Sequence, residues 1–67
     1  MITATINGQQ APWEHPLTIQ QYLQTQGYTI ERVAVERNGQ IVPKNVYGTQ
    51  QIQHGDTVEV VSFVGGG

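Results

Sequence analysis

The sequence predicts a single α+β domain, in which one main helix packs on one face of a mixed sheet of four to five strands. Three observations predict this class. Runs rich in β-branched residues lie near both ends of the chain, two Asn-Gly pairs mark tight turns, and one short stretch has helical spacing. A single short amphipathic helix can cover one face of one sheet, so we expect one hydrophobic core between them.

The first hairpin is expected at the N-terminus. Its first strand covers residues 2–6, which are mostly Ile and Thr, and ends at Asn7-Gly8. Asn-Gly accepts the positive φ that both central positions of a tight hairpin turn require. The return strand covers residues 9–13. Because Pro12 has no amide proton to donate, we expect this strand at an edge of the sheet.

A helix is expected to begin directly after Thr18. Thr18 and Gln21 have the spacing of a capping box, in which each side chain bonds the backbone of the other residue. The apolar positions that follow have helical spacing: Ile19, Tyr22 and Leu23. Gly27 suits the position just past a helix end. A helix of roughly two and a half turns must rely on packing for its stability.

A second pair of strands is expected at residues 32–37 and 40–42. Asn38-Gly39 makes the turn between them, and Pro43 ends the second strand. Alternation along the first of these strands places its two valines, at positions 33 and 35, on the same face.

The last strand is expected at residues 57–63, after an irregular polar stretch with three apolar anchors: Val46, Tyr47 and Ile52. Residues 2–6 and 57–63 are the richest in β-branched residues, so we place them at the centre of the sheet. If they pair in parallel, the chain between them supplies the long crossover that parallel pairing needs. This arrangement is the β-grasp, or ubiquitin-like, fold.

The last strand should have one buried and one exposed face. Val58 and Val60 point one way, and Val61 and Phe63 point the other. Since the helix covers only one face, we expect Val61 and Phe63 to form an exposed apolar patch that binds a partner. The alternative is that Phe63 folds over an edge or packs on Tyr47.

Composition excludes several functions. The chain has three Lys and Arg residues and a formal net charge of −2, so nucleic-acid binding is not expected. It has no Cys, which excludes disulfides and thiolate zinc sites. There is no phosphate-binding loop motif, and the two His residues stand apart from other metal ligands, so we expect this chain to bind no cofactor or metal. No run is apolar enough for a membrane span or a signal peptide, which predicts a cytoplasmic location.

Three glycines close the chain. We expect residues 1–64 to form the domain and Gly65, Gly66 and Gly67 to form a flexible tail. Residues without Cβ make a thin stalk that can enter a narrow slot, and the only reactive group on this stalk is the α-carboxylate of Gly67. A disordered end or a tag remnant is the alternative interpretation. Ordering three such residues in a channel costs about 3–6 kcal/mol, which docking of the domain must offset.

Residues 33–43, residues 55–61 and the closing Gly66-Gly67 resemble the ThiS family, the sulfur carriers of thiamine thiazole biosynthesis. The resemblance covers nearly the whole chain, and its C-terminal half is the specific part. A third glycine, Gly65, does not conflict with it. The resemblance implies a protein cosubstrate that has no active site of its own.

In that family, an E1-like adenylyltransferase of the ThiF type activates the C-terminal carboxylate, with ATP and Mg on the enzyme. A cysteine desulfurase supplies sulfur, and the resulting thiocarboxylate delivers it to a ThiG-type thiazole synthase. By resemblance, Gly67 carries first the adenylate and then the sulfur, while Gly65 and Gly66 thread the channel of the partner. A molybdopterin-synthase-type sulfur carrier, a ubiquitin-like protein modifier and a binding module with an inert tail remain alternatives.

Overall fold

The computed structural model describes residues 1–63 of the 67-residue chain. The main sheet is built from five strands: β1 (Ile2–Ile6), β2 (Gln9–Trp13), β4 (Val33–Arg37), β5 (Gln40–Ile41) and β7 (Thr57–Ser62). A second, two-stranded sheet consists of β3 (Leu17–Thr18) and β6 (Gln51–Ile52). The helical elements are α1 (Ile19–Thr25) and two short 3₁₀ helices, η1 (Ile30–Arg32) and η2 (Lys44–Val46).

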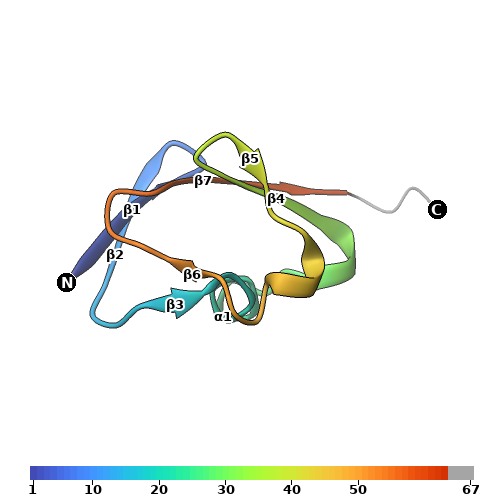
Figure 1. Cartoon of the computed structure of the whole chain (residues 1–67), viewed down its shortest axis with the longest axis horizontal. Helices are drawn as coiled ribbons and strands as arrows, with labels where there is room; N and C mark the ends of the chain where they lie inside the picture. Colours follow the sequence, from blue (N-terminus) through green and yellow to red (C-terminus); the bar gives the residue numbers. More distant parts are fainter. Residues whose placement is uncertain (64–67) are drawn as a thin grey trace.

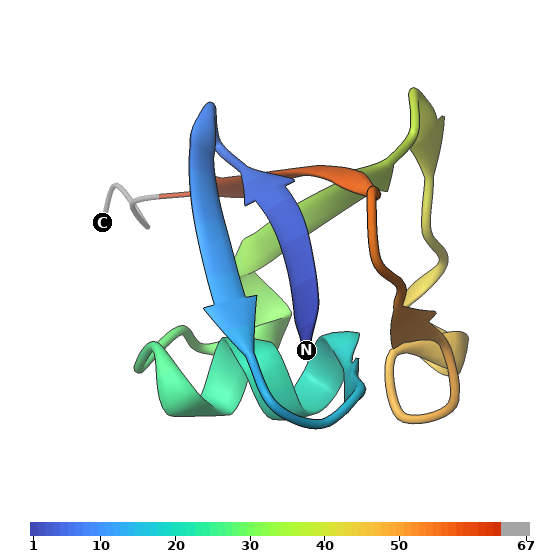
Figure 2. The same ribbon diagram turned by 90° about the vertical axis from the view of Figure 1, so that its left-hand side faces the viewer.

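The strand order of the main sheet is β2-β1-β7-β4-β5, and α1 packs against one of its faces (Figures 1 and 2). The two terminal strands, β1 and β7, lie at the centre and run parallel, with Thr5 opposite Thr57 and Ile6 opposite Val58. All other strand pairs of this sheet are antiparallel. The predicted β-grasp architecture is therefore confirmed, including the parallel central pair and the edge position of the strand that contains Pro12.

Both Asn-Gly pairs form the turns that the sequence predicts. Asn7 and Gly8 have φ angles of 50° and 81°, and Asn38 and Gly39 have φ angles of 54° and 83°. Positive φ at two successive positions matches the right-handed twist of the flanking strands. These turns fix the register of the β1–β2 and β4–β5 hairpins.

The capping box of α1 is also confirmed. The Gln21 amide donates to the Thr18 hydroxyl at 3.1 Å, and the Thr18 amide donates to Oε1 of Gln21 at 2.9 Å. Ile19 and Leu23 are buried against the sheet, so this short helix is held by packing as well as by its cap.

Replacing Thr18 by Ala is expected to lower the free energy of unfolding by about 1 kcal/mol, because the Gln21 amide at the start of α1 loses its acceptor, the Thr18 hydroxyl. Urea unfolding measures the change. Thr25→Ala is the matched control, since the Thr25 hydroxyl bonds only a carbonyl in the last turn, that of Tyr22. An equal loss in both variants would contradict a capping role for Thr18.

Several details differ from the sequence-based expectation. The strand predicted from residue 32 begins at Val33, because η1 precedes it, and the strand predicted to residue 63 ends at Ser62. The strand predicted over residues 40–42 is only two residues long, although the Val42 amide still bonds the Val35 carbonyl at 2.9 Å. The β3–β6 pair was not predicted, because two-residue strands carry no measurable alternation.

The core lies between α1 and the main sheet and has eleven buried apolar residues in the described part of the chain. They come from every layer: Ala4, Ile6, Ile19, Leu23, Val33, Val35, Val42, Tyr47, Ile52, Val58 and Val60. Tyr47 and Ile52 confirm two of the predicted anchors in the irregular stretch, whereas Val46 is only partly buried. These anchors hold residues 43–53 against the core. The regular elements in this segment are the 3₁₀ helix η2 and the two-residue strand β6.

Candidate functional site

Strand β7 is the central strand of the main sheet, and its last residues lead to the C-terminal end of the chain (Figure 1). It pairs with β4 along five register positions, from Val58 opposite Arg37 to Ser62 opposite Val33. The Phe63 amide extends this pairing by donating to the Arg32 carbonyl at 2.6 Å. The backbone is thus held by β4 as far as Ser62 and by Arg32 at Phe63, the last described residue.

On its other side β7 extends beyond the end of β1. The parallel pairing stops at Val58, and beyond it the Asn7 side chain bonds the backbone of β7. Its Oδ1 accepts from the Val60 amide at 2.8 Å and its Nδ2 donates to the Val60 carbonyl at 3.2 Å. Asn7 therefore serves both as a turn residue with positive φ and as the end of the β1–β7 pairing.

The outward residues at the end of β7 are apolar and exposed. Val61 is 54% exposed and Phe63 is 56% exposed, whereas Val58 and Val60 are buried in the core. The predicted exposure of Val61 and Phe63 is confirmed. This exposure contradicts the alternative in which Phe63 is covered by folding over an edge or by packing on Tyr47. We call Val61 and Phe63 the β7 patch; its role in binding a partner stays a prediction.

The glycines expected to carry the chemistry, Gly65, Gly66 and Gly67, lie outside the described residues, as does Val64. The predicted division into a domain of residues 1–64 and a tail of residues 65–67 stays a prediction for the same reason. What the structure adds is the position from which these residues depart, which is the projecting end of β7 beside the β7 patch.

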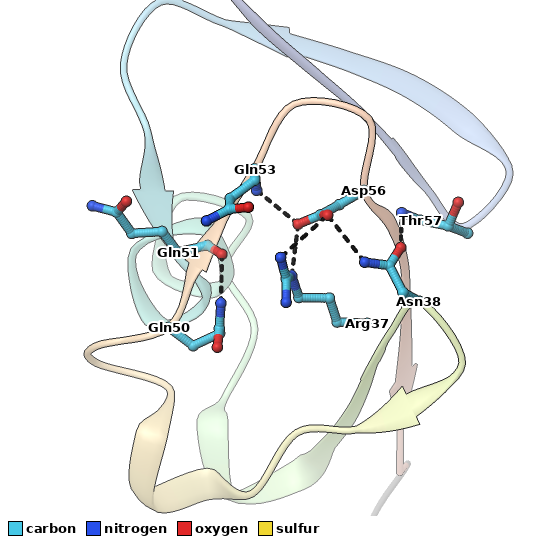
Figure 3. A network of polar contacts seen from close by, with 7 residues as sticks. All are labelled: Arg37, Asn38, Gln50, Gln51, Gln53, Asp56 and Thr57. Atoms are coloured by element: carbon cyan, nitrogen blue, oxygen red, sulfur yellow. Dashed lines mark hydrogen bonds and ion pairs between the residues drawn. The ribbon is translucent and has the colours of Figure 1, made fainter.

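The opposite end of β7 is anchored by a polar network around Asp56 (Figure 3). Its carboxylate accepts from Nε of Arg37 at 2.6 Å and from the Gln53 amide at 2.7 Å, and the Asn38 side chain donates to it at 3.1 Å. The Asn38 Oδ1 in turn accepts from the Thr57 amide at 2.9 Å. The network fastens the turn before β7 to the β4–β5 hairpin.

The Asp56 carboxylate is held in its charged form. Burial alone would raise its pKa, but the hydrogen bonds from Arg37, Gln53 and Asn38, together with the Arg37 charge, bring the pKa of Asp56 below its ordinary value. The sequence analysis did not identify the Arg37–Asp56 pair, since the two residues are 19 positions apart. The ion pair with Arg37 and the bond from the Gln53 amide give Asp56 a structural role at the turn before β7.

The remaining polar side chains of the described part of the chain mainly bond backbone groups. Among residues 1–63 there is no group of three side chains that could hold a metal ion, and no helix long and apolar enough to cross a membrane. The His54 side chain accepts from the Thr3 amide at 3.1 Å, a contact that sequence analysis missed. A hollow of about 180 Å³ lies beside β5 and η2, and its one charged lining residue, Arg37, is already paired.

Comparison with known proteins gives a consistent result. The model of the ThiS family matches residues 4–67 of this chain. A protein from Bacillus subtilis named sulfur carrier protein ThiS is 36% identical over 63 residues, which cover 92% of this chain and 96% of that protein. The crystal structure of the thiamine biosynthesis protein ThiS from Geobacter metallireducens superposes with a TM-score of 0.82. It is 28% identical, and the match covers 98% of this chain and all of that one.

A second group of relatives is much longer. The thiazole synthase of Paramagnetospirillum magneticum is 40% identical over 62 residues, and the match covers 92% of this chain but only 19% of that protein. The chain thus spans about a fifth of the length of such relatives. In them, a segment similar to this chain is part of a polypeptide named for the synthase.

Proposed function

Because the chain belongs to the ThiS family, we propose that it is a sulfur carrier of thiamine biosynthesis whose Gly67 α-carboxylate is the site of sulfur attachment. The family match carries the proposal, since it extends over the final glycines as well as the folded body. The exposed β7 patch at the base of these glycines supports it. The proposal requires Gly67 to be the last residue of the mature chain.

The chemistry needs a partner, because a carboxylate is a poor electrophile at neutral pH. An E1-like enzyme of the ThiF type, which holds ATP and Mg, would join the Gly67 carboxylate to AMP and release pyrophosphate. A sulfur nucleophile then attacks the acyl carbon, AMP leaves, and a thiocarboxylate remains. With hydrosulfide the step is complete as written. With the persulfide of a cysteine desulfurase, a thiol must supply the two electrons that cleave the S–S bond.

The chain itself would supply position and shape, without an active site of its own. Strand β7 is paired with β4 up to Ser62, and the Phe63 amide bonds the Arg32 carbonyl, so the base of the tail is fixed relative to the docking surface. The thiocarboxylate sulfur is a good nucleophile and would be handed to a thiazole synthase. Support for that recipient comes from the thiazole synthases that contain a segment similar to this chain.

The proposal is tested by the mass of the intact protein. We expect incubation with ATP, the E1-like enzyme and hydrosulfide to add the mass difference between sulfur and oxygen, and omission of ATP to prevent it. High-molecular-weight conjugates in place of this shift would identify a protein modifier. Transfer of the sulfur to molybdopterin synthase but not to thiazole synthase would identify the other carrier type. An unchanged mass with all components present would contradict the proposal.

Replacing Phe63 by Ala is expected to weaken binding to the E1-like enzyme by about 1–3 kcal/mol, because a half-exposed ring at the base of the tail would be buried in the complex. Isothermal titration calorimetry measures this change. Met1→Ala is the matched control, since Met1 is also a large exposed apolar residue but precedes the opposite end of the sheet. Equal affinities for the wild type and Phe63→Ala would remove the β7 patch from the interface.

A further inference from the structure

The face of the main sheet that turns away from α1 is uncovered within residues 1–63 (Figures 1 and 2). Its centre holds two glutamates, Glu36 of β4 and Glu59 of β7, which are direct register partners and are both exposed. Ile41 of β5 is the register partner of Glu36 on the other side and is 76% exposed. Val61 follows Glu59 on the same face of β7. Two carboxylates are thus bordered by two exposed aliphatic side chains.

The pairing of Glu36 with Glu59 is unfavourable in the isolated chain. Register partners of an antiparallel pair have Cβ atoms about 4.5–5.5 Å apart, and like charges in these positions destabilise the sheet. Neither glutamate belongs to an ion pair within residues 1–63, where the one salt bridge joins Arg37 to Asp56. Arg37 is next to Glu36 in sequence but its side chain is on the opposite face, as alternation requires.

We propose that this face docks on thiazole synthase, and that a cationic side chain of the synthase, an arginine or a lysine, is inserted between Glu36 and Glu59. A planar guanidinium has enough donors to bond both carboxylates, and its charge removes their repulsion. Apolar groups of the synthase would cover Ile41 and Val61, which excludes water from the ion pairs and strengthens them. The inference rests on the proposed function as a sulfur carrier.

Two observations favour the synthase as the occupant. Proteins named thiazole synthase contain a segment 40% identical to this chain, so in them a domain of this kind stays beside the synthase permanently. The face is also continuous with the β7 patch through Val61, which places it at the base of the glycines that would carry the sulfur. Charge complementarity then defines the chemistry of the contact. The two glutamates of this chain require a cation on the synthase, and the apolar residues around them require apolar groups around that cation.

The proposal predicts opposite effects on stability and on binding. Glu36→Gln and Glu59→Gln should each raise the urea midpoint of the free chain, because each removes the like-charge repulsion. Each should weaken binding to the thiazole synthase by about tenfold, because a charge-assisted bond to the inserted cation is lost. The double variant should weaken it by less than the product of the two single effects, since both glutamates share one cation.

Surface plasmon resonance with immobilised thiazole synthase measures these affinities at about 0.05 M and about 0.5 M NaCl. Glu14→Gln is the control, because it makes the same change in net charge at an exposed position outside the sheet. We expect near wild-type affinity for Glu14→Gln, and a smaller dependence on salt for the variants of Glu36 and Glu59 than for the wild type.

Equal effects of Glu14→Gln and the two sheet variants would overturn the docking proposal, as would a loss of stability in step with the loss of affinity. Absence of binding by the wild type would overturn it as well. The carrier function is assessed separately, by formation of the thiocarboxylate on the wild-type chain with the E1-like enzyme. Suppose that the wild type is loaded with sulfur and that the Glu36 and Glu59 variants bind the synthase as tightly as the wild type. The proposed carrier function would then stand, and the proposed docking mode would be wrong.

Discussion

Deletion of Gly67 is expected to abolish sulfur loading while the domain stays folded. The shortened chain still ends in a carboxylate, that of Gly66, but this carboxylate is drawn back by about 3.5 Å, the length of one extended residue. A reacting carbon displaced that far no longer meets the α-phosphate of ATP, so we expect the rate of adenylation to fall by at least about a hundredfold. Pyrophosphate release measures adenylation, and intact mass measures sulfur loading.

The companion variant keeps the length and removes the charge. A chain whose Gly67 ends in a carboxamide, made by ligation, has the same glycines but no carboxylate oxygen to attack ATP. We expect it to bind the E1-like enzyme and to release no pyrophosphate. Circular dichroism should show the same unfolding transition for all three chains, since the last buried core residue among residues 1–63 is Val60, well before the altered end. Sulfur loading of either altered chain would end the assignment of Gly67 as the acceptor.

Replacing Asp56 by Ala is expected to be the most destabilising of the changes considered. The side chain is 8% exposed and accepts four hydrogen bonds, two of them from Arg37. Removing one partner of a buried ion pair typically costs about 3–5 kcal/mol. We expect the lower end of this range, because the Arg37 side chain is partly exposed and can be rehydrated. A domain of this size has a total stability of only about 3–10 kcal/mol.

Urea unfolding of Asp56→Ala, Arg37→Ala and the double variant separates the pair from its surroundings. Because the two residues act together, we expect the double variant to lose less stability than the sum of the single variants. Additive losses would show that Arg37 and Asp56 stabilise the fold independently.

The same carboxylate predicts the acid side of the stability profile. The pKa of Asp56 is lower in the folded chain than its ordinary value, so its contribution is fully present above about pH 4 and is lost as the pH falls through the folded pKa. Stability should therefore decrease below about pH 4, and Asp56→Asn should show a flatter acid limb. Urea midpoints measured from about pH 6 to about pH 2 check this. An identical acid limb in Asp56→Asn would assign the titration to other carboxylates.

Most of the correct fold predictions depended on patterns of residues that are close together in the sequence. The turns at Asn7 and Asn38 and the cap at Thr18 depend on residue types within four positions of each other, and these features have strong sequence patterns. The centre of the sheet followed from the concentration of β-branched residues in the two terminal strands. The β3–β6 pair could not be predicted in this way, because two short segments meet only after the core has brought residues 17 and 52 together.

The candidate site was likewise predicted only in part from the sequence. Alternation along β7 was enough to predict that Val61 and Phe63 are exposed, because one helix can cover only one face. The pairing of Glu36 with Glu59, in contrast, depends on the register between β4 and β7. That register is set by the whole sheet, and no pattern within either strand indicates it. The same holds for the contact between Arg37 and Asp56.

The placement of β7 has a mechanical consequence. A partner that draws the C-terminal end of the chain into a channel pulls along the axis of this strand. Five register positions with β4 and two with β1 oppose that force side by side, so they would have to yield together and not one after another. A force at right angles to the strand would instead break the same bonds one after another. The domain can therefore be handled by its end, repeatedly, without unravelling.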